Sequence, residues 1–303
     1  MFTSPRTKLI SMLILGGMSS AIPAFGHARL DDHHEGRKRR PPVVAPPAVT
    51  PSGVSYSAIL GAAGTFGIFG GAAGITNQGI YTVINGDIGT TAASTLITGF
   101  HDVEAVYTET PLNIGSVNGT IYTATAPLGS VPSVIASAAA LGAQKAFDML
   151  SPAALPGGID VSTQGGGAGE LGNRTLGPGV YRSAAASFAI QGGDLTLDGR
   201  GDPNATWVFQ MATTLTVGGP GVAFPQSVIL INGAQAKNVF WQVGSSATIN
   251  AAGGGTMVGT IISSATTTFS TAGNVVVVTL QGRALALNAS VTMVNTHINL
   301  PAL

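Results

Sequence analysis

A five-residue pattern recurs along the second half of the chain and constrains its fold more than any other feature. Its second residue is always Ser or Thr, its fourth is usually Thr, and its third and fifth are mostly apolar. The copies are residues 186–190, 213–217, 245–249, 265–269 and 289–293. Strand side chains alternate between two faces, so each copy buries two residues and presents two small ones. Repeats spaced roughly 20 to 50 residues apart predict a solenoid or a similar array.

Stacking the copies as successive coils would align their outward residues in two rows. Neighbours in one row would lie about 4.8 Å apart, and the two rows would lie roughly 6.6 Å apart along each strand. The second-position row consists of Ser187, Thr214, Ser246, Thr266 and Ser290. The fourth-position row consists of Ala189, Thr216, Thr248, Thr268 and Thr292, with Thr76 of an earlier short run as a further candidate. A competing row on another face would run through Val83, Thr196, Thr256 and Thr279.

The first 26 residues have the pattern of a secretory signal. Arg6 and Lys8 give it a positive start, an apolar run begins at residue 9, and small residues surround a cleavage site near residue 26. Residues 27–53 mix charged residues with prolines and lack helical or strand periodicity, which predicts an unstructured linker. The chain has no Cys, so disulfides, thiolate metal sites and a lipid-modified N-terminus are excluded.

We assign residues 54–303 to one large domain, a size that β architectures commonly reach undivided. This region carries ten acidic and six basic side chains, and the resulting negative charge argues against nucleic acid as a partner. Gly, Ala, Thr, Ser, Val and Ile dominate its composition. Its surface must therefore consist largely of small neutral groups, which is unusual for a soluble protein.

The same region offers little for catalysis. Its histidines are His101 and His297, and Asp87, Asp194 and Asp198 stand beside glycines, as turn residues do. Polysaccharide lyases and hydrolases built on parallel β-helices need clustered acids, bases or metal ligands. We therefore predict neither an enzyme nor a metal or organic cofactor.

Residues 131–150 form the one convincing helix. Ser130 is placed to cap its start, Pro132 fits its first turn, and Pro152 ends it. Its apolar stripe, which is expected to pack on the solenoid, consists of Val134, Ala138, Leu141, Ala146 and Met149. Leu141→Asp should then unfold the domain, because an unpaired buried charge is costly.

Short apolar or β-branched runs separated by glycine predict the remaining strands. They are residues 65–69, 74–77, 82–88, 180–183, 194–198, 206–211, 228–231, 239–243 and 275–280. Residues 208–211 and 239–243 are apolar on both sides, so they need a cover that the helix can supply. Residues 90–130 lack a clear repeat and are predicted to cap the open end of the solenoid.

Several stretches resemble the large microbial ice-binding protein family. They are residues 60–69 (LGAAGTFGIF), 83–89 (VINGDIG), 176–181 (LGPGVY), 195–210, 230–248, 259–261 and 282–288 (GRALALN). They occur in the family's order and span nearly all of residues 57–298. Lys237 departs from the family, whose members often have Cys there, and the charged linker is an addition.

The resemblance implies a mostly β fold, a right-handed discontinuous β-solenoid of triangular cross-section with one long flanking α-helix. It also implies that the N-terminal coil packs beside the C-terminal coils. The implied activity is binding of ice crystal planes by one flat solenoid face, without chemistry or cofactor. Because the family's ice face has no strict motif, the two rows above remain our own inference from periodicity.

Ice presents a neutral, ordered lattice of hydrogen-bonding groups, so its binder needs a rigid, uncharged and regularly spaced surface. Thr combines a methyl group, a hydroxyl and restricted rotamers, and rigidity lowers the entropy lost on binding. Outward Ser and Thr are also ordinary strand residues, so a secreted adhesin or matrix protein without ice affinity is the alternative function. We expect a secreted monomer whose ice activity falls in Thr248→Tyr but not in Thr256→Tyr.

Overall fold

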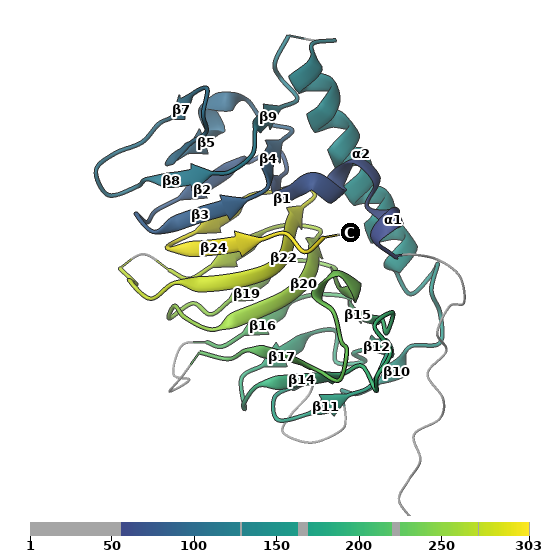
Figure 1. Ribbon diagram of the computed structural model, residues 1–303. Coiled ribbons are helices and arrows are strands. Elements are labelled where there is room, and N and C mark those ends of the chain that lie inside the picture. The colour runs from purple at the N-terminus through teal and green to yellow at the C-terminus, as the bar shows by residue number, and fades with distance from the viewer. Residues whose placement is uncertain (1–55, 128, 163–168, 220–224, 272, 303) are drawn as a thin grey trace, which may run out of the picture. The chain divides into compact units, whose positions relative to one another are not determined.

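Short parallel strands stack into three sheets, and successive turns of the chain form the coils of a solenoid (Figure 1). The computed structural model describes residues 56–302 except residues 128, 163–168, 220–224 and 272. The predicted secretory signal and linker, residues 1–26 and 27–53, lie outside the described residues.

The first face, which we call the repeat face, is a seven-stranded parallel sheet that contains all five copies of the sequence pattern. Its strands, in spatial order, are β13 (Phe188–Ile190), β16 (Leu215–Val217), β19 (Ala247–Ile249), β21 (Thr267–Phe269), β23 (Val291–Met293), β2 (Ile75–Asn77) and β5 (Ile97–Thr98). Each three-residue strand buries its two end residues and leaves the middle one half-exposed. Thr267 and Asn77 are the polar residues among the buried end residues, and the Thr267 hydroxyl lies 2.9 Å from Ser263 Oγ.

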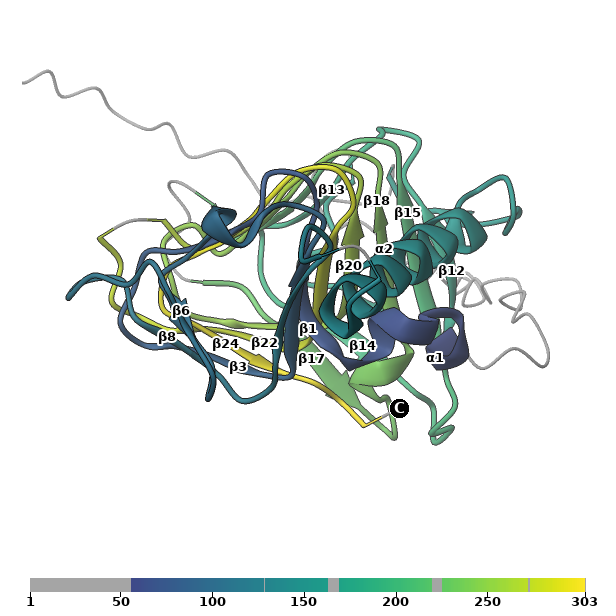
Figure 2. The same cartoon turned by 90° about the horizontal axis from the view of Figure 1, so that it is seen from above.

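The second face, the helix-covered face, has apolar residues on both sides of its strands. It consists of β10 (Ile159–Asp160), β12 (Gly179–Arg182), β15 (Trp207–Met211), β18 (Val239–Val243), the second halves of β20 (Thr256–Ser263) and β22 (Val278–Ala286), β1 (Phe66–Gly70), β4 (Asp87–Thr90) and β9 (Ile121–Thr123). Strands β15 and β18 are buried throughout, and helix α2 (Val131–Leu150) runs across this face, as Figure 2 shows. The prediction that the helix covers the doubly apolar strands is confirmed.

The third face is divided between two sheets. A three-stranded sheet contains β11 (Thr175–Leu176), β14 (Leu195–Asp198) and β17 (Val228–Ile231). The remainder contains the first halves of β20 and β22, followed by β24 (Thr296–Asn299), β3 (Thr82–Asn85), β8 (Gly115–Val117), β6 (Phe100–His101) and β7 (Val106–Tyr107). Strand β20 changes neighbours at Gly259, whose φ of 98° gives the backbone the bend that joins the third face to the helix-covered face.

The described chain also contains four short helical turns at the margins of the sheets. They are α1 (Tyr56–Ile59), η1 (Gly61–Thr65), η2 (Ser94–Leu96) and η3 (Ala236–Asn238). The first two of these, α1 and η1, lie between α2 and the sheet. Their residues Ile59 and Ala63, and Leu60 between them, pack with the small residues of α2.

Helix α2 has the predicted bounds, but the predicted apolar stripe is largely on the wrong side. Its buried residues are Ser133, Ala136, Ala139, Ala143, Ala146 and Leu150. Leu141 is 72% exposed and Val134 is 56% exposed. The prediction that Leu141 is buried, and that Leu141→Asp therefore unfolds the domain, is wrong. A Cβ at Gly142 would lie 2.5 Å from the Leu60 carbonyl oxygen, so the helix lies too close for large side chains. Ser130 is the N-cap residue, although its hydroxyl makes no capping hydrogen bond.

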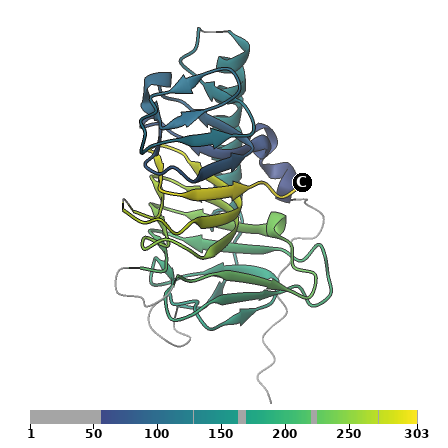
Figure 3. The same ribbon diagram turned by 60° about the vertical axis from the view of Figure 1, so that its left-hand side comes forward.

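The N-terminal coil packs beside the C-terminal coil, as the family resemblance implies. Strand β1 pairs with β22, β2 with β23 and β3 with β24, and we call this boundary the seam (Figures 1 and 3). Arg283 crosses it, because its Nε donates to the Gly64 carbonyl oxygen at 2.9 Å. Burial lowers the pKa of Arg283 to about 10. On the far side of the N-terminal coil, β4, β5 and β8 extend the three faces by one further coil, and β9 adds a last strand beside β4.

Candidate functional site

The fourth-position row is continuous and in register across the repeat face. Ladder pairing places its members next to one another in the order Ala189, Thr216, Thr248, Thr268, Thr292 and Thr76. Each is the half-exposed middle residue of its strand. Thr76 lies far from the others in the sequence and is brought into the row by the seam.

One member of this row is absent from our sequence prediction. Thr98 on β5 pairs with Thr76, and its hydroxyl donates to Thr76 Oγ1 at 3.2 Å. The sequence signal was the dipeptide Ile97-Thr98, which repeats Ile75-Thr76 of the preceding coil. With Thr98 the row has a member on each of the seven strands, and its centre is Thr268.

The second-position row precedes the strands and follows the same register. The carbonyl groups of Thr214, Ser246, Thr266 and Ser290 accept ladder hydrogen bonds from Phe188, Leu215, Ala247 and Thr267, respectively. The row stops at the seam, because the next coil has Gly74 at this position. A Cβ at Gly74 would lie 2.2 Å from the Leu96 carbonyl oxygen, so a larger residue does not fit there. The repeat face therefore carries two rows on one side of the seam and one row on the other.

Hydroxyl groups of neighbouring coils bind one another within both rows. Thr266 Oγ1 donates to Ser246 Oγ at 3.0 Å, and Thr292 Oγ1 donates to Thr268 Oγ1 at 3.1 Å. A hydroxyl has one proton and two lone pairs, so each of these groups keeps capacity for an external partner. The contacts also restrict rotamers that β-branching already limits. The result is a stiff surface of methyl and hydroxyl groups.

Neither row contains an ionisable side chain. The carboxyl groups with shifted pKa values lie elsewhere: the Ser162 hydroxyl lowers the pKa of Asp160, and the Arg200 backbone N–H lowers that of Asp198. Burial, helped by Asp102 and Glu104, raises the pKa of Tyr107 on β7. The repeat face is thus electrically neutral at its two rows.

The competing row lies on the third face and is less regular. Thr256 pairs with Thr279, Thr279 with His297, and His297 with Val83, so an imidazole interrupts the series. Thr196 belongs to the separate three-stranded sheet, where its neighbour on β17 is Ile229. The structure therefore does not bring the four predicted residues into one row.

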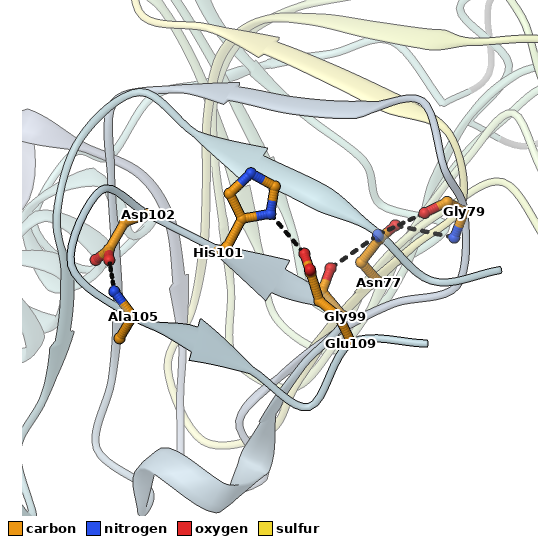
Figure 4. Close-up of polar contacts among 7 residues, drawn as sticks. All are labelled: Asn77, Gly79, Gly99, His101, Asp102, Ala105 and Glu109. Atoms are coloured by element: carbon orange, nitrogen blue, oxygen red, sulfur yellow. Dashed lines mark hydrogen bonds and ion pairs between the residues drawn. The ribbon is translucent and has the colours of Figure 1, made fainter. Parts of the chain in front are cut away.

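Groups suited to metal binding are not assembled in the described part of the chain, where no three His, Asp or Glu side chains converge. His101 Nδ1 instead lies 2.6 Å from Glu109 Oε1 (Figure 4). This contact links β6 to the residues that follow β7 and stabilises the β6–β7 hairpin. Among the described helices, none is both long enough and apolar enough to cross a membrane.

Comparison with known proteins shows that residues 69–299 match the model of a family described as ice-binding-like. An ice-binding protein of Nostoc sp. (strain HG1) is 37% identical over 235 residues, which are 78% of this chain and 71% of the relative. The crystal structure of an ice-binding protein from the Antarctic ascomycete Antarctomyces psychrotrophicus has a TM-score of 0.61 at 32% identity, covering 80% of this chain and 98% of that one. A glycosylated ice-binding protein from an Arctic yeast has a TM-score of 0.63 at 30% identity, covering 80% and 94% of the two chains. The chain, a discontinuous β-solenoid with one long flanking helix, belongs to the ice-binding-like family.

Proposed function

We propose that this protein is secreted and binds ice through the repeat face, using the fourth-position row together with the second-position row. Adsorption to ice crystal planes would give thermal hysteresis and inhibit ice recrystallisation. The observation that carries the proposal is the in-register series from Thr216 to Thr98, in which six neighbouring strands each present a Thr. Family membership supports it independently.

The chemistry of the face suits a crystalline water surface. Strand spacing repeats the hydroxyl and methyl groups about every 4.8 Å, which offers a regular array to a regular lattice. Hydroxyl pairs such as Thr292 with Thr268 limit side-chain motion before binding, so less entropy is lost on adsorption. Charged groups, which would hold their own hydration shells, are absent from both rows.

We further propose that the protein acts as a monomer, without catalysis, cofactor or metal, and does not bind nucleic acid. Support comes from the chain's composition: the region after residue 53 has an excess of acidic over basic side chains. His297 is half-exposed on the third face, and His101 is held by Glu109, so neither histidine stands in a cluster suited to acid–base chemistry.

The test is a bulky substitution on each of two faces. Thr248→Tyr projects a ring from the repeat face next to its centre, and it should abolish most ice shaping and thermal hysteresis because the lattice contact is lost. Thr256→Tyr is the matched control, since Thr256 is a half-exposed strand Thr of the third face. Both variants should keep the free energy of unfolding within about 0.5 kcal/mol of the parent protein, as is usual for surface sites.

The outcomes separate the proposed function from its alternative. If Thr256→Tyr loses activity and Thr248→Tyr keeps it, the third face binds ice and the repeat face does not. If the parent protein neither shapes ice crystals nor depresses the freezing point, a secreted adhesin or matrix protein is the better description.

A further inference from the structure

Asn77 is a fully buried amide at a position that is apolar on the other strands of the repeat face. It ends β2, and the equivalent inward residues of the neighbouring three-residue strands are Ile190, Val217, Ile249, Phe269 and Met293. A buried amide is unfavourable unless it is hydrogen-bonded, so its presence at this one strand requires an explanation.

Every hydrogen-bonding site of the Asn77 side chain is used. Nδ2 donates to the carbonyl oxygens of Gly79 at 2.7 Å and Gly99 at 3.0 Å, and Oδ1 accepts the Gly79 N–H at 3.1 Å (Figure 4). Oδ1 also accepts the Thr82 hydroxyl at 2.7 Å, and Thr82 Oγ1 in turn accepts the Thr296 N–H at 3.1 Å. Four hydrogen bonds are the full capacity of an amide side chain.

These bonds join three coils at the seam. Asn77 follows Thr76 on β2, Gly99 follows Thr98 on β5, and Thr296 begins β24 in the coil that carries Thr292. Gly99 has a φ of 76°, and a Cβ there would lie 2.5 Å from the Asn77 carbonyl oxygen. The two corners are therefore stacked directly on each other.

Apolar packing alone specifies this stacking poorly. The strands of the repeat face have similar sequences, so β2 could exchange neighbours or slip in register while still burying apolar residues. A single buried Asn that is satisfied in only one arrangement selects that arrangement, as it does in coiled coils.

We propose that Asn77 is a positioning residue that aligns Thr76 and Thr98 with Thr292, so that the fourth-position row continues across the seam. Its consequence for ice binding rests on the proposed function of the repeat face. The alignment itself is a structural claim that can be measured without ice.

The primary test is Asn77→Leu, which gives β2 the apolar residue that the other strands have. Amide hydrogen exchange of residues 97–99 should accelerate by about tenfold or more, because the Gly99 corner loses its partner. Exchange of residues 247–249, on β19, should stay within about twofold, since that strand lies away from the seam. Thr267→Val is the matched control: it removes a buried hydroxyl of the same face, and it should leave residues 97–99 unchanged.

A second readout separates positioning from general stabilisation. In the parent protein, Thr98→Tyr should reduce ice activity, whereas in the Asn77→Leu background the same change should cause little further loss. Additive losses would show that Thr98 stays in the row without Asn77, and the proposal would fail.

Hydrogen exchange distinguishes failure of the positioning role from failure of the proposed ice-binding function. Unchanged exchange at residues 97–99 in a folded Asn77→Leu protein overturns the positioning role, even if Thr248→Tyr abolishes ice activity. If Asn77→Leu does not fold, Thr82→Val replaces it, because this change cuts the link to Thr296 and keeps the bonds to Gly79 and Gly99. Exchange at residues 97–99 should then rise by a smaller factor, and no change would reject the proposal.

Discussion

The repeat face and the helix-covered face belong to the same coils but present outward residues of opposite character. On the repeat face the outward residues are the Thr, Ser and Ala residues of the two rows. On the helix-covered face they include Val180, Val208, Phe240, Ile262 and Leu285, which pack with the buried residues of α2 and with α1 and η1. The interior sides of both faces are mainly apolar and share one hydrophobic core. The outward side chains therefore decide whether a face is covered by the protein or left open for an external partner.

Several buried polar residues also lie on the outward side of the helix-covered face, and they are Gln210, Gln242, Thr260 and Arg283. Gln210 faces the helix, and its Nε2 donates to the carbonyl oxygens of Leu150 at 2.8 Å and Leu155 at 2.9 Å. The last carbonyl groups of a helix lack intrahelical partners, so this amide satisfies the end of α2. Gln210 therefore helps to hold the C-terminal end of α2 against the sheet.

The largest effect is expected from removing an outward aromatic residue of the helix-covered face. Phe240→Ala should lower the free energy of unfolding by about 3–5 kcal/mol, because it opens a cavity beneath α2. Ice activity per folded molecule should be unchanged, since the repeat face is on another side of the coil. Denaturant unfolding and ice shaping of the same preparation measure the two quantities. Loss of activity in a folded variant would show that the two faces are not independent.

A pair of helix variants sharpens the same contrast. Ala143→Asp places a charge against the sheet and should destabilise by about 3 kcal/mol or more. Leu141→Asp, two residues earlier, changes an exposed side chain and should alter the free energy of unfolding by about 0.5 kcal/mol. Thermal unfolding of the two proteins compares them directly. Equal destabilisation would contradict the packing of α2 described above.

The smallest effect concerns pH. Hydrogen bonds lower the pKa values of Asp160 and Asp198 in the folded protein. These carboxylates therefore stabilise the folded state at pH values above the ordinary Asp pKa of 3.8. This contribution is lost as the pH falls through their lower folded-state pKa values. Stability should therefore decline slightly on acidification. Ice activity of the folded protein should not follow, because neither row titrates. Thermal hysteresis measured at two or three pH values, with unfolding monitored in parallel, tests this; a pH-dependent activity at constant folded fraction would place a titrating group in the site.

Local sequence patterns predicted the elements whose signals lie within a few residues. The bounds of α2, β17 and β18 agree with residues 131–150, 228–231 and 239–243, because proline, glycine and apolar runs delimit them. The fourth-position row could be predicted for the same reason, since its register follows from repeated strands. Residues 275–280 mislead, because Val275 and Val276 are exposed at a corner and the strand runs from Val278 to Ala286.

What could not be predicted depends on contacts between distant segments. Thr98 enters the row only because β5 stacks on β2, and the role of Asn77 becomes visible only when Thr82 and Thr296 are seen together. The apolar stripe of the helix was misassigned because counting apolar residues favours Val134 and Leu141. The close approach of the helix instead requires glycine at residue 142, beside the Leu60 carbonyl, and alanine at the buried residues 139, 143 and 146. Steric space, and not hydrophobicity, selects the buried side of α2.

The seam has a consequence for how the chain reaches this structure. Thr296 hydrogen-bonds to Thr82 across a sequence separation of 214 residues, so the first coil acquires its neighbour only when nearly the last residues are available. Closing so long a loop is entropically costly before the contacts that reward it can form, and topologies of this kind fold slowly. During synthesis the edges of β1, β2 and β3 stay unpaired on one side until β22, β23 and β24 emerge. A chain released before its final coil would expose three strand edges at once, which makes truncated products prone to aggregate.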